Sequence, residues 1–191
     1  MAYAIHRYRD LIATPWRNGG GVTREIAAWP PGADMWTFDW RVSLATVAGA
    51  GPFSAFPGTD RILTVVEGSL DIALADAPRR RLVGTSPPFA FPGEAAAWAE
   101  APEGSATDYN VMSRRGRIVA EVTRLRGLMT IDLPAGGWVV ILATGAGGLS
   151  IGAKSEHLER LDTLLADARE APLKVILTAN AGAILARLRV A

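Results

Sequence analysis

The stretch GAGPFSAFPGTDRILTVVEG, residues 49–68, does most to indicate how this chain folds. Its second half, RILTVVEG, is an almost continuous apolar run that ends on a glycine. Such a run is typical of a strand that is buried on both sides and closed by a turn. Its first half is rich in Gly and Pro, which favours an irregular connection. The stretch therefore predicts a turn-rich connector followed by one central strand of a sheet.

Alternating apolar and polar residues lie on both sides of this stretch. In TFDWRVSLATV (37–47), Phe38 and Trp40 begin an apolar series that we expect in the core, and shorter alternations occupy VTREI (22–26) and DYNVMSRRG (108–116). A period of two is expected of β-strands, whose successive side chains point to opposite faces. Because the connectors between these segments are short and rich in turn residues, they suit hairpins. The chain is therefore predicted to be all-β, an antiparallel barrel or sandwich.

The strand pattern starts again after residue 127. Further strand candidates are found at 128–152, at KVILTA (174–179) and at AILARLRV (183–190). This restart predicts a first barrel over residues 1–126 and a second, reduced half over 127–191, which either stands apart or packs with the first as one unit. The segment SEHLERLDTLLADAREAP (155–172) has leucines at helical spacing. The same leucines also suit a turn and a short strand, so both structures stay open for it.

Composition argues against several classes of function. The 20 Lys and Arg residues nearly balance the 19 Asp and Glu residues, giving a formal net charge of +1, so nucleic acid is not expected as a partner. The chain has no cysteine, which excludes disulfides, thiolate nucleophiles and Cys-type zinc sites. No segment is an apolar run long enough for a signal peptide or a membrane span. We therefore expect a cytoplasmic protein with no membrane partner.

The glycine spacing in residues 49–68 resembles the first metal-binding motif of the cupin barrels. That motif reads Gly, five residues, His-x-His, three residues, Glu, six residues, Gly. Here Gly49 and Gly68 stand at its two ends, Ala55 and Pro57 at the histidine positions and Arg61 at the glutamate position. None of the three substituted side chains binds metal, and a guanidinium in place of a carboxylate favours an anion instead of a cation.

Metal binding elsewhere in the chain is also not expected. His6 and His157 are its two histidines, so no site with several histidines can form from one strand pair. A magnesium site made of carboxylates is the lesser alternative. We therefore predict no metal and no other cofactor. The carboxylates that this alternative would use are Glu25, Asp39, Asp60 and Glu67.

Three segments together resemble the HutD/Ves family: PWRNGGGVTREI (15–26), residues 38–68 and DYNVMSRRG (108–116), in the family's order and at its usual spacing. The resemblance implies a bicupin fold, with two cupin-like barrels in one chain. It also implies a link with histidine utilisation in bacteria, where the family is suggested to be a regulator that senses a small metabolite. Urocanate and formylglutamate, intermediates of histidine breakdown, are the ligands that it suggests.

Polar side chains on the strand faces make up the predicted binding site. Because barrel walls alternate between inside and outside, polar residues of several strands are expected to face one lumen. Arginines there can hold a carboxylate by paired hydrogen bonds, and Trp16, Phe53 and Phe56 can form an apolar wall. The predicted ligand-binding residues are Asn18, Thr23, Glu25, Arg41, Ser43, Phe53, Ser54, Asp60, Arg61, Asn110, Met112 and Arg114.

Three functions stay open on this sequence. The first is a metal-independent binding protein, a regulator or sensor for a small carboxylate metabolite, with no catalytic residue. The second is a metal-free isomerase or hydrolase in which Glu25 or Asp60 acts as general base. The third is a protein that has lost its ligand and acts through a partner surface on its second half, and a homodimer through a sheet edge is open too. The charged strand residues either form the site or only pair with one another to set strand order.

Overall fold

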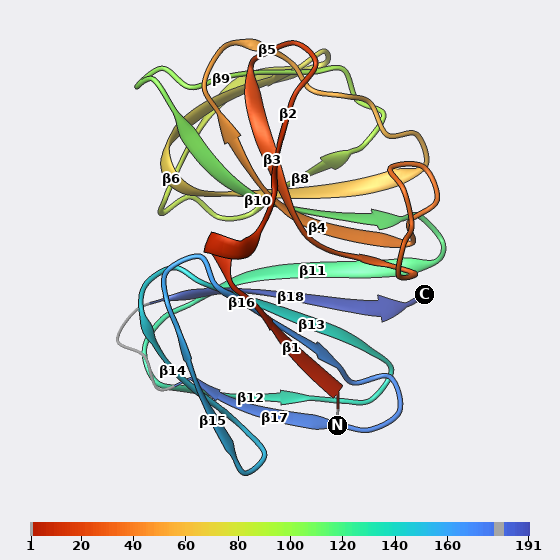
Figure 1. The fold of residues 1–191 in the computed structure, drawn as a ribbon. Helices are drawn as coiled ribbons and strands as arrows, with labels where there is room; N and C mark the ends of the chain where they lie inside the picture. Colours follow the sequence, from red (N-terminus) through yellow and green to blue (C-terminus); the bar gives the residue numbers. More distant parts are fainter. Residues whose placement is uncertain (1, 178–181) are drawn as a thin grey trace. The chain divides into compact units, whose positions relative to one another are not determined.

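The structure is a computed structural model that describes residues 2–177 and 182–191. The chain forms two compact units: residues 12–118 make the N-terminal unit, and residues 1–11 and 119–191 make the C-terminal unit. The division therefore differs from the expected one after residue 126. The reason is strand pairing, because β1 (Ala2–His6) pairs with β16 (Thr163–Asp167), and β11 (Ile118–Leu125) belongs to the same sheet (Figure 1).

The N-terminal unit is a curled antiparallel sheet of nine strands in the order β2-β3-β4-β10-β6-β9-β5, with β7 and β8 also pairing with β6 (Figure 1). The alternating segments of the sequence form β3, β4 and β10, as predicted. The strands are β2 (Ala13–Pro15), β3 (Gly21–Trp29), β4 (Trp40–Val47), β5 (Gly51–Pro52), β6 (Thr59–Leu74), β7 (Ala77–Val83), β8 (Phe89–Pro92), β9 (Ala97–Glu100) and β10 (Ala106–Arg114).

Strand β6 does not end at Gly68, where the sequence predicts a turn. The strand continues to Leu74, and its pairing with β10 shifts register between Thr107 and Asp108. Gly68 has a φ of +71°, and a Cβ atom there would lie 2.4 Å from the carbonyl oxygen of Ser105. Glycine is needed at this position because its φ is positive and the Ser105 backbone leaves no room for a Cβ atom. The strand therefore continues through Gly68, close to a β-bulge, and does not turn there.

The core of the N-terminal unit lies inside the curled sheet. Leu63 and Val65 of β6 are buried there together with Leu70, Ile72 and Phe91. We call this inner face of the sheet the lumen of the N-terminal unit. Phe38 and Trp40 are also fully buried, as their place in the alternation predicted.

The C-terminal unit has two antiparallel sheets, in the orders β1-β16-β13-β18-β11 and β12-β17-β14-β15. A cluster of buried aliphatic residues, including Ile141, Val175 and Leu185, draws on both sheets and forms its core. A short 3-10 turn, η1 (Tyr8–Asp10), follows β1. The remaining strands are β12 (Met129–Leu133), β13 (Gly137–Ala143), β14 (Gly147–Ile151), β15 (Lys154–Leu158), β17 (Leu173–Leu177) and β18 (Ala183–Val190). The last two residues of the predicted strand at 174–179 lie outside the described residues.

The helical alternative for residues 155–172 is wrong. The segment forms the end of β15 and all of β16, and Leu158, Leu161 and Leu164 are buried. The turn between the two strands is held by Asp162, whose carboxylate accepts hydrogen bonds from the backbone N–H of Glu159 and from the Arg7 guanidinium. The leucines recur because both strands contribute to the core, so tertiary packing overrides helix periodicity. No helix in residues 2–177 and 182–191 has the length and apolar character to cross a membrane.

Candidate functional site

Three neighbouring strands bring predicted site residues onto one face of the sheet. On β6, β10 and β4, Arg61 lies opposite Met112, and Met112 lies opposite Arg41. Two residues further along β10, Asn110 lies opposite Ser43 of β4. Residues that are directly opposite, or two apart on one strand, share a face. These five side chains therefore lie on one face. Leu63 of β6, which is opposite Asn110, lies on the same face and belongs to the core of the N-terminal unit, so the face is the lumen.

Strand β3 extends this face. Glu25 lies opposite Ser43, and its carboxylate accepts a hydrogen bond of 2.6 Å from Nε of Arg41. Thr23, two residues away, accepts a 2.7 Å hydrogen bond from Nε1 of Trp16. The placement of these residues on one side of the sheet agrees with the period-two prediction. Their polar atoms, however, are already engaged within the protein.

Arg61 is the central charged residue of the lumen. Its side chain is buried, the residue being 5% exposed, and its guanidinium carbon lies 5.3, 5.6 and 5.0 Å from the ring centres of Phe53, Phe56 and Phe91. Burial lowers the pKa of Arg61 to about 10, so the group still carries its charge at neutral pH. Nη1 donates a 3.3 Å hydrogen bond to a backbone carbonyl, whereas Nε has no partner in the described part of the chain.

Asp108 is a second buried charged residue, and the sequence analysis did not select it. It lies on β10 at the alternation position of Asn110 and Met112, so it faces the lumen. Burial raises the pKa of its carboxyl group to about 7, and the charge of Arg61 limits the rise. Neither of its oxygens has a hydrogen-bond partner among the described residues. An acid in the middle of a buried strand, on the face of the arginine, was the signal that could have found it.

The lumen therefore holds several polar atoms that lack partners within the described structure: Nε of Arg61, both carboxylate oxygens of Asp108 and Oδ1 of Asn110. Buried polar atoms are almost always hydrogen-bonded, to protein, water or ligand, because leaving them bare costs about 1–3 kcal/mol each. These atoms therefore lack hydrogen-bond partners within the described residues on the inner face that also carries Arg61.

Two predicted site residues do not belong to this cluster. Asp60 precedes Arg61 on β6 and therefore points to the opposite face, where it is exposed and accepts a 2.9 Å hydrogen bond from Arg115. Arg114 lies at the end of β10, and its guanidinium donates to the backbone carbonyls of Pro57 and Trp36 at 3.2 and 2.7 Å. It ties two loops together instead of offering its donors to a ligand.

Two further predicted residues lie at the margin. Asn18 is exposed, and its side-chain oxygen accepts a 3.0 Å hydrogen bond from the backbone N–H of Gly20, which stabilises a turn. Ser54 is exposed too, and it contributes its backbone carbonyl to Arg61. Phe53, in contrast, packs on Arg61 as the expected apolar wall and meets Trp16 edge-to-face at 5.9 Å.

The positions of the cupin metal motif are now defined in space. Ala55 and Pro57 lie in the exposed connection between β5 and β6, whereas Arg61 points into the lumen. Within the described ranges no three His, Asp or Glu side chains are arranged to hold a metal ion. Glu25 and Asp60, two of the carboxylates considered for magnesium, each form an ion pair with an arginine. Of the unpartnered groups in the lumen, the guanidinium of Arg61 suits an anion, whereas the oxygens of Asp108 and Asn110 are hydrogen-bond acceptors.

Comparison with known proteins agrees with this architecture. The family model HutD matches residues 8–185. Protein Ves of Cronobacter sakazakii is 37% identical over 129 residues, which is 67% of this chain and 70% of that protein. Protein Ves of Citrobacter koseri is 37% identical over 143 residues, or 73% of each chain.

Solved structures extend the comparison to the fold. HutD from Pseudomonas fluorescens SBW25 is 27% identical, covers 100% of both chains and superposes with a TM-score of 0.87. A conserved protein of unknown function from Pseudomonas aeruginosa PAO1 is 28% identical, with 99% and 100% coverage and a TM-score of 0.88. A cupin 2 conserved barrel domain protein from Leptotrichia buccalis is similar in fold alone, at 12% identity, 98% and 96% coverage and a TM-score of 0.63. The fold is thus all-β and cupin-like, and this chain belongs to the HutD family and is related to the Ves proteins.

Proposed function

We propose that the protein binds a small carboxylate metabolite in the lumen of the N-terminal unit, without a metal ion, and that it acts as a sensor linked to histidine utilisation. The observation that carries the proposal is the buried guanidinium of Arg61, whose Nε is without a partner in the described structure. A carboxylate pairs with a guanidinium through two parallel hydrogen bonds, which are stronger than hydrogen bonds between neutral groups. The link to histidine utilisation rests on the family resemblance.

The surroundings of Arg61 favour a small, partly apolar acid. Phe53, Phe56 and Phe91 surround the guanidinium, so a ligand that reaches it also contacts aromatic surface. Low solvent exposure strengthens the charge interaction relative to one at the protein surface. Asn110, with an unpartnered side-chain oxygen among the described residues, can accept a hydrogen bond from an N–H or O–H group of the same ligand.

Asp108 makes binding dependent on pH. When its carboxyl group is protonated, the O–H can donate a hydrogen bond to a bound carboxylate, and Arg61 remains as the charge facing it. When it is ionised, the two negative charges repel each other. Because the pKa of Asp108 lies at about 7, we expect anion binding to strengthen as the pH falls through neutrality.

The proposal is tested by thermal unfolding with a panel of acids: formate as the smallest carboxylate, urocanate and formylglutamate. Binding to the native state raises the free energy of unfolding by about 3 kcal/mol at a ligand concentration 100-fold above Kd, which appears as a higher Tm. Arg61→Met should abolish the increase in Tm, since methionine keeps most of the side-chain volume but removes the guanidinium and its N–H donors. Arg115→Met is the matched control, because Arg115 pairs with exposed Asp60. A panel that leaves the wild-type Tm unchanged would refute the proposal.

The second candidate function is that of an enzyme, and it rests on the position and pKa of one acidic residue. Glu25 and Asp60 are poorly placed as general bases, since both are paired with arginines and Asp60 lies on the other face. Asp108, however, is a buried acid in the lumen with a pKa of about 7, which is the range that general acid–base catalysis requires. Product formation from urocanate or formylglutamate that is lost in Asp108→Asn would favour this candidate. Binding without turnover in the same samples would favour the sensor.

A further inference from the structure

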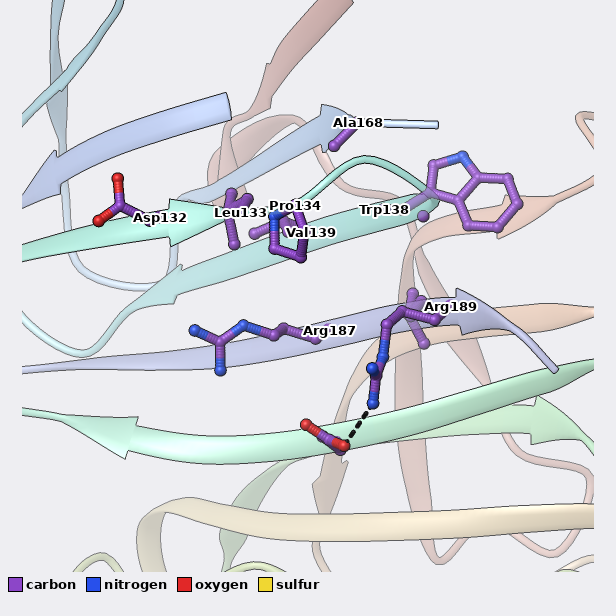
Figure 2. Close-up of a pocket in the computed structure, with 11 residues that line it drawn as sticks. Asp132, Leu133, Pro134, Trp138, Val139, Ala168, Arg187 and Arg189 are labelled. Carbon is purple, nitrogen blue, oxygen red and sulfur yellow. Dashed lines mark hydrogen bonds and ion pairs between the residues drawn. The ribbon is translucent and has the colours of Figure 1, made fainter. Parts of the chain in front are cut away.

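The C-terminal unit has a groove with a volume of about 240 Å³. It lies where β12 ends and β13 begins, next to the last residues of β18. Figure 2 shows Arg187 and Arg189 extending from one strand, with Leu133, Pro134 and Val139 on neighbouring segments. Ligand pockets commonly measure about 300–1,000 Å³, so this groove suits a molecule of few atoms.

Arg187 reaches the groove from the core side of its strand. On β18, Ala183 and Leu185 point into the core of the unit, and Arg187 continues the same face. Its direct neighbour on β13 is Val139, which is buried in that core. Arg187 is half-buried, and within the described residues its guanidinium has no hydrogen-bond or ion-pair partner. Its charge therefore lies beside apolar surface and forms no ion pair with a described residue.

The other charged groups of the groove are already paired. Arg189, next on the same face, forms a 2.7 Å ion pair with Glu121 (Figure 2). Oδ1 of Asp132 lies 3.5 Å from Nζ of Lys174, a residue that does not line the groove. Arg187 thus supplies the free positive charge of the lining, as far as the described chain shows. The two carboxylates nearby disfavour a guest with more than one negative charge.

We propose that this groove is a second binding site, for a small monocarboxylic acid with an apolar body. Arg187 holds the carboxylate with two parallel hydrogen bonds. Leu133, Pro134 and Val139 contact the apolar part. The site is independent of the lumen around Arg61, because its lining residues all belong to the C-terminal unit.

Methyl NMR on the full chain tests the proposal, with isovalerate as the probe. In protein labelled at Leu and Val methyls, the signals of Leu133 and Val139 report on the groove, and those of Leu63 and Val65 report on the lumen of the N-terminal unit. We expect saturable shifts of the groove signals with isovalerate, and none with the uncharged isovaleramide. Arg187→Gln should weaken isovalerate binding at these signals by about tenfold or more, as expected for loss of hydrogen bonds to a charged group.

Arg189→Gln is the matched control, since Arg189 lies on the same strand and face but is paired with Glu121. It should retain the wild-type affinity within about threefold. Both arginines are partly exposed, so the variants should fold, and unchanged methyl spectra without probe confirm this. The proposal is overturned if isovalerate leaves the groove signals unchanged, if Arg187→Gln responds like the wild type, or if isovaleramide binds equally well. Shifts confined to Leu63 and Val65 would overturn it while leaving the proposed function intact.

Discussion

Replacing Asp108 by asparagine should make the protein more stable at alkaline pH. In the unfolded chain the carboxyl group has a pKa of 3.8, and burial raises the folded-state pKa to about 7. Between these two values the folded state binds a proton that the unfolded state does not. The free energy of unfolding therefore falls as the pH rises from about 4 to about 7, and it stays low above that range. Asparagine carries no titratable proton, so this loss disappears.

The size of the effect follows from the same two values. Each pH unit within the window contributes about 1.4 kcal/mol, so the wild type loses about 4 kcal/mol in all through Asp108. Of this, about 3 kcal/mol falls between pH 5 and pH 8. The attraction between ionised Asp108 and Arg61 is already contained in the pKa. Because the asparagine amide is also buried without obvious partners, we expect a net stabilisation of about 2 kcal/mol at pH 8.

Urea unfolding at pH 5 and pH 8 measures this directly. The difference in unfolding free energy between Asp108→Asn and the wild type should be larger at pH 8 by about 3 kcal/mol. Asp60→Asn is the control for removing an acid outside the lumen, since Asp60 is exposed on the other face, and it should not reproduce the effect of Asp108→Asn. Equal pH slopes in Asp108→Asn and the wild type would show that the carboxyl group is not held in a dry lumen.

Three further predictions concern the lumen, the bulge in β6 and the turn at Asp162. Calorimetry should show that the affinity of the wild type for a monocarboxylate rises about tenfold from pH 8 to pH 6. The affinity of Asp108→Asn should stay constant over this range. An unchanged wild-type affinity would contradict the role given to Asp108. Gly68→Ala should lower the free energy of unfolding by about 3 kcal/mol, because the new Cβ atom would lie 2.4 Å from the Ser105 carbonyl oxygen. Gly116→Ala is the control and should cost about 1 kcal/mol, since Gly116 has a similar φ of +76° but no heavy atom within 4 Å of the new Cβ atom. Asp162→Asn should lower stability by about 2 kcal/mol at pH 7, since the carboxylate accepts hydrogen bonds from Arg7 and from two backbone N–H groups. Burial raises the pKa of Asp162, but these bonds outweigh burial and hold the pKa below 3.8. The loss of stability in Asp162→Asn should therefore shrink as the pH falls through about 3.8 and below. A loss that stays constant down to about pH 2.5 would argue against the ion pair.

Much of the fold could be predicted from local pattern. The alternations at 22–26, 37–47 and 108–116 all form strands, since a period of two is a property of the strand itself. The segment 155–172 was ambiguous because leucines at helical spacing also fit two short strands that share a core. The division between the units was missed because it depends on β1 pairing with β16, more than 150 residues away.

The candidate site, too, could be predicted from the sequence only in part. Arg41, Arg61 and Asn110 could be placed on one face from alternation alone, whereas Asp60 was assigned to that face although it adjoins Arg61 in sequence and must point away. Asp108 was overlooked although its alternation with Asn110 and Met112 places it on the same face, because the alternation gives the face of a side chain and not how completely it is buried.

By itself the sequence determined that the chain is built of strands, that the metal-binding positions of the cupin motif hold other residues, and that an arginine occupies one of them. Only the tertiary structure decided which charged groups are already paired and which are not. Glu25 and Arg41 neutralise each other, whereas Arg61 and Asp108 keep polar atoms without partners among the described residues. The physical reason is that hydrogen bonding and desolvation depend on the register between strands distant in sequence, which no local pattern specifies.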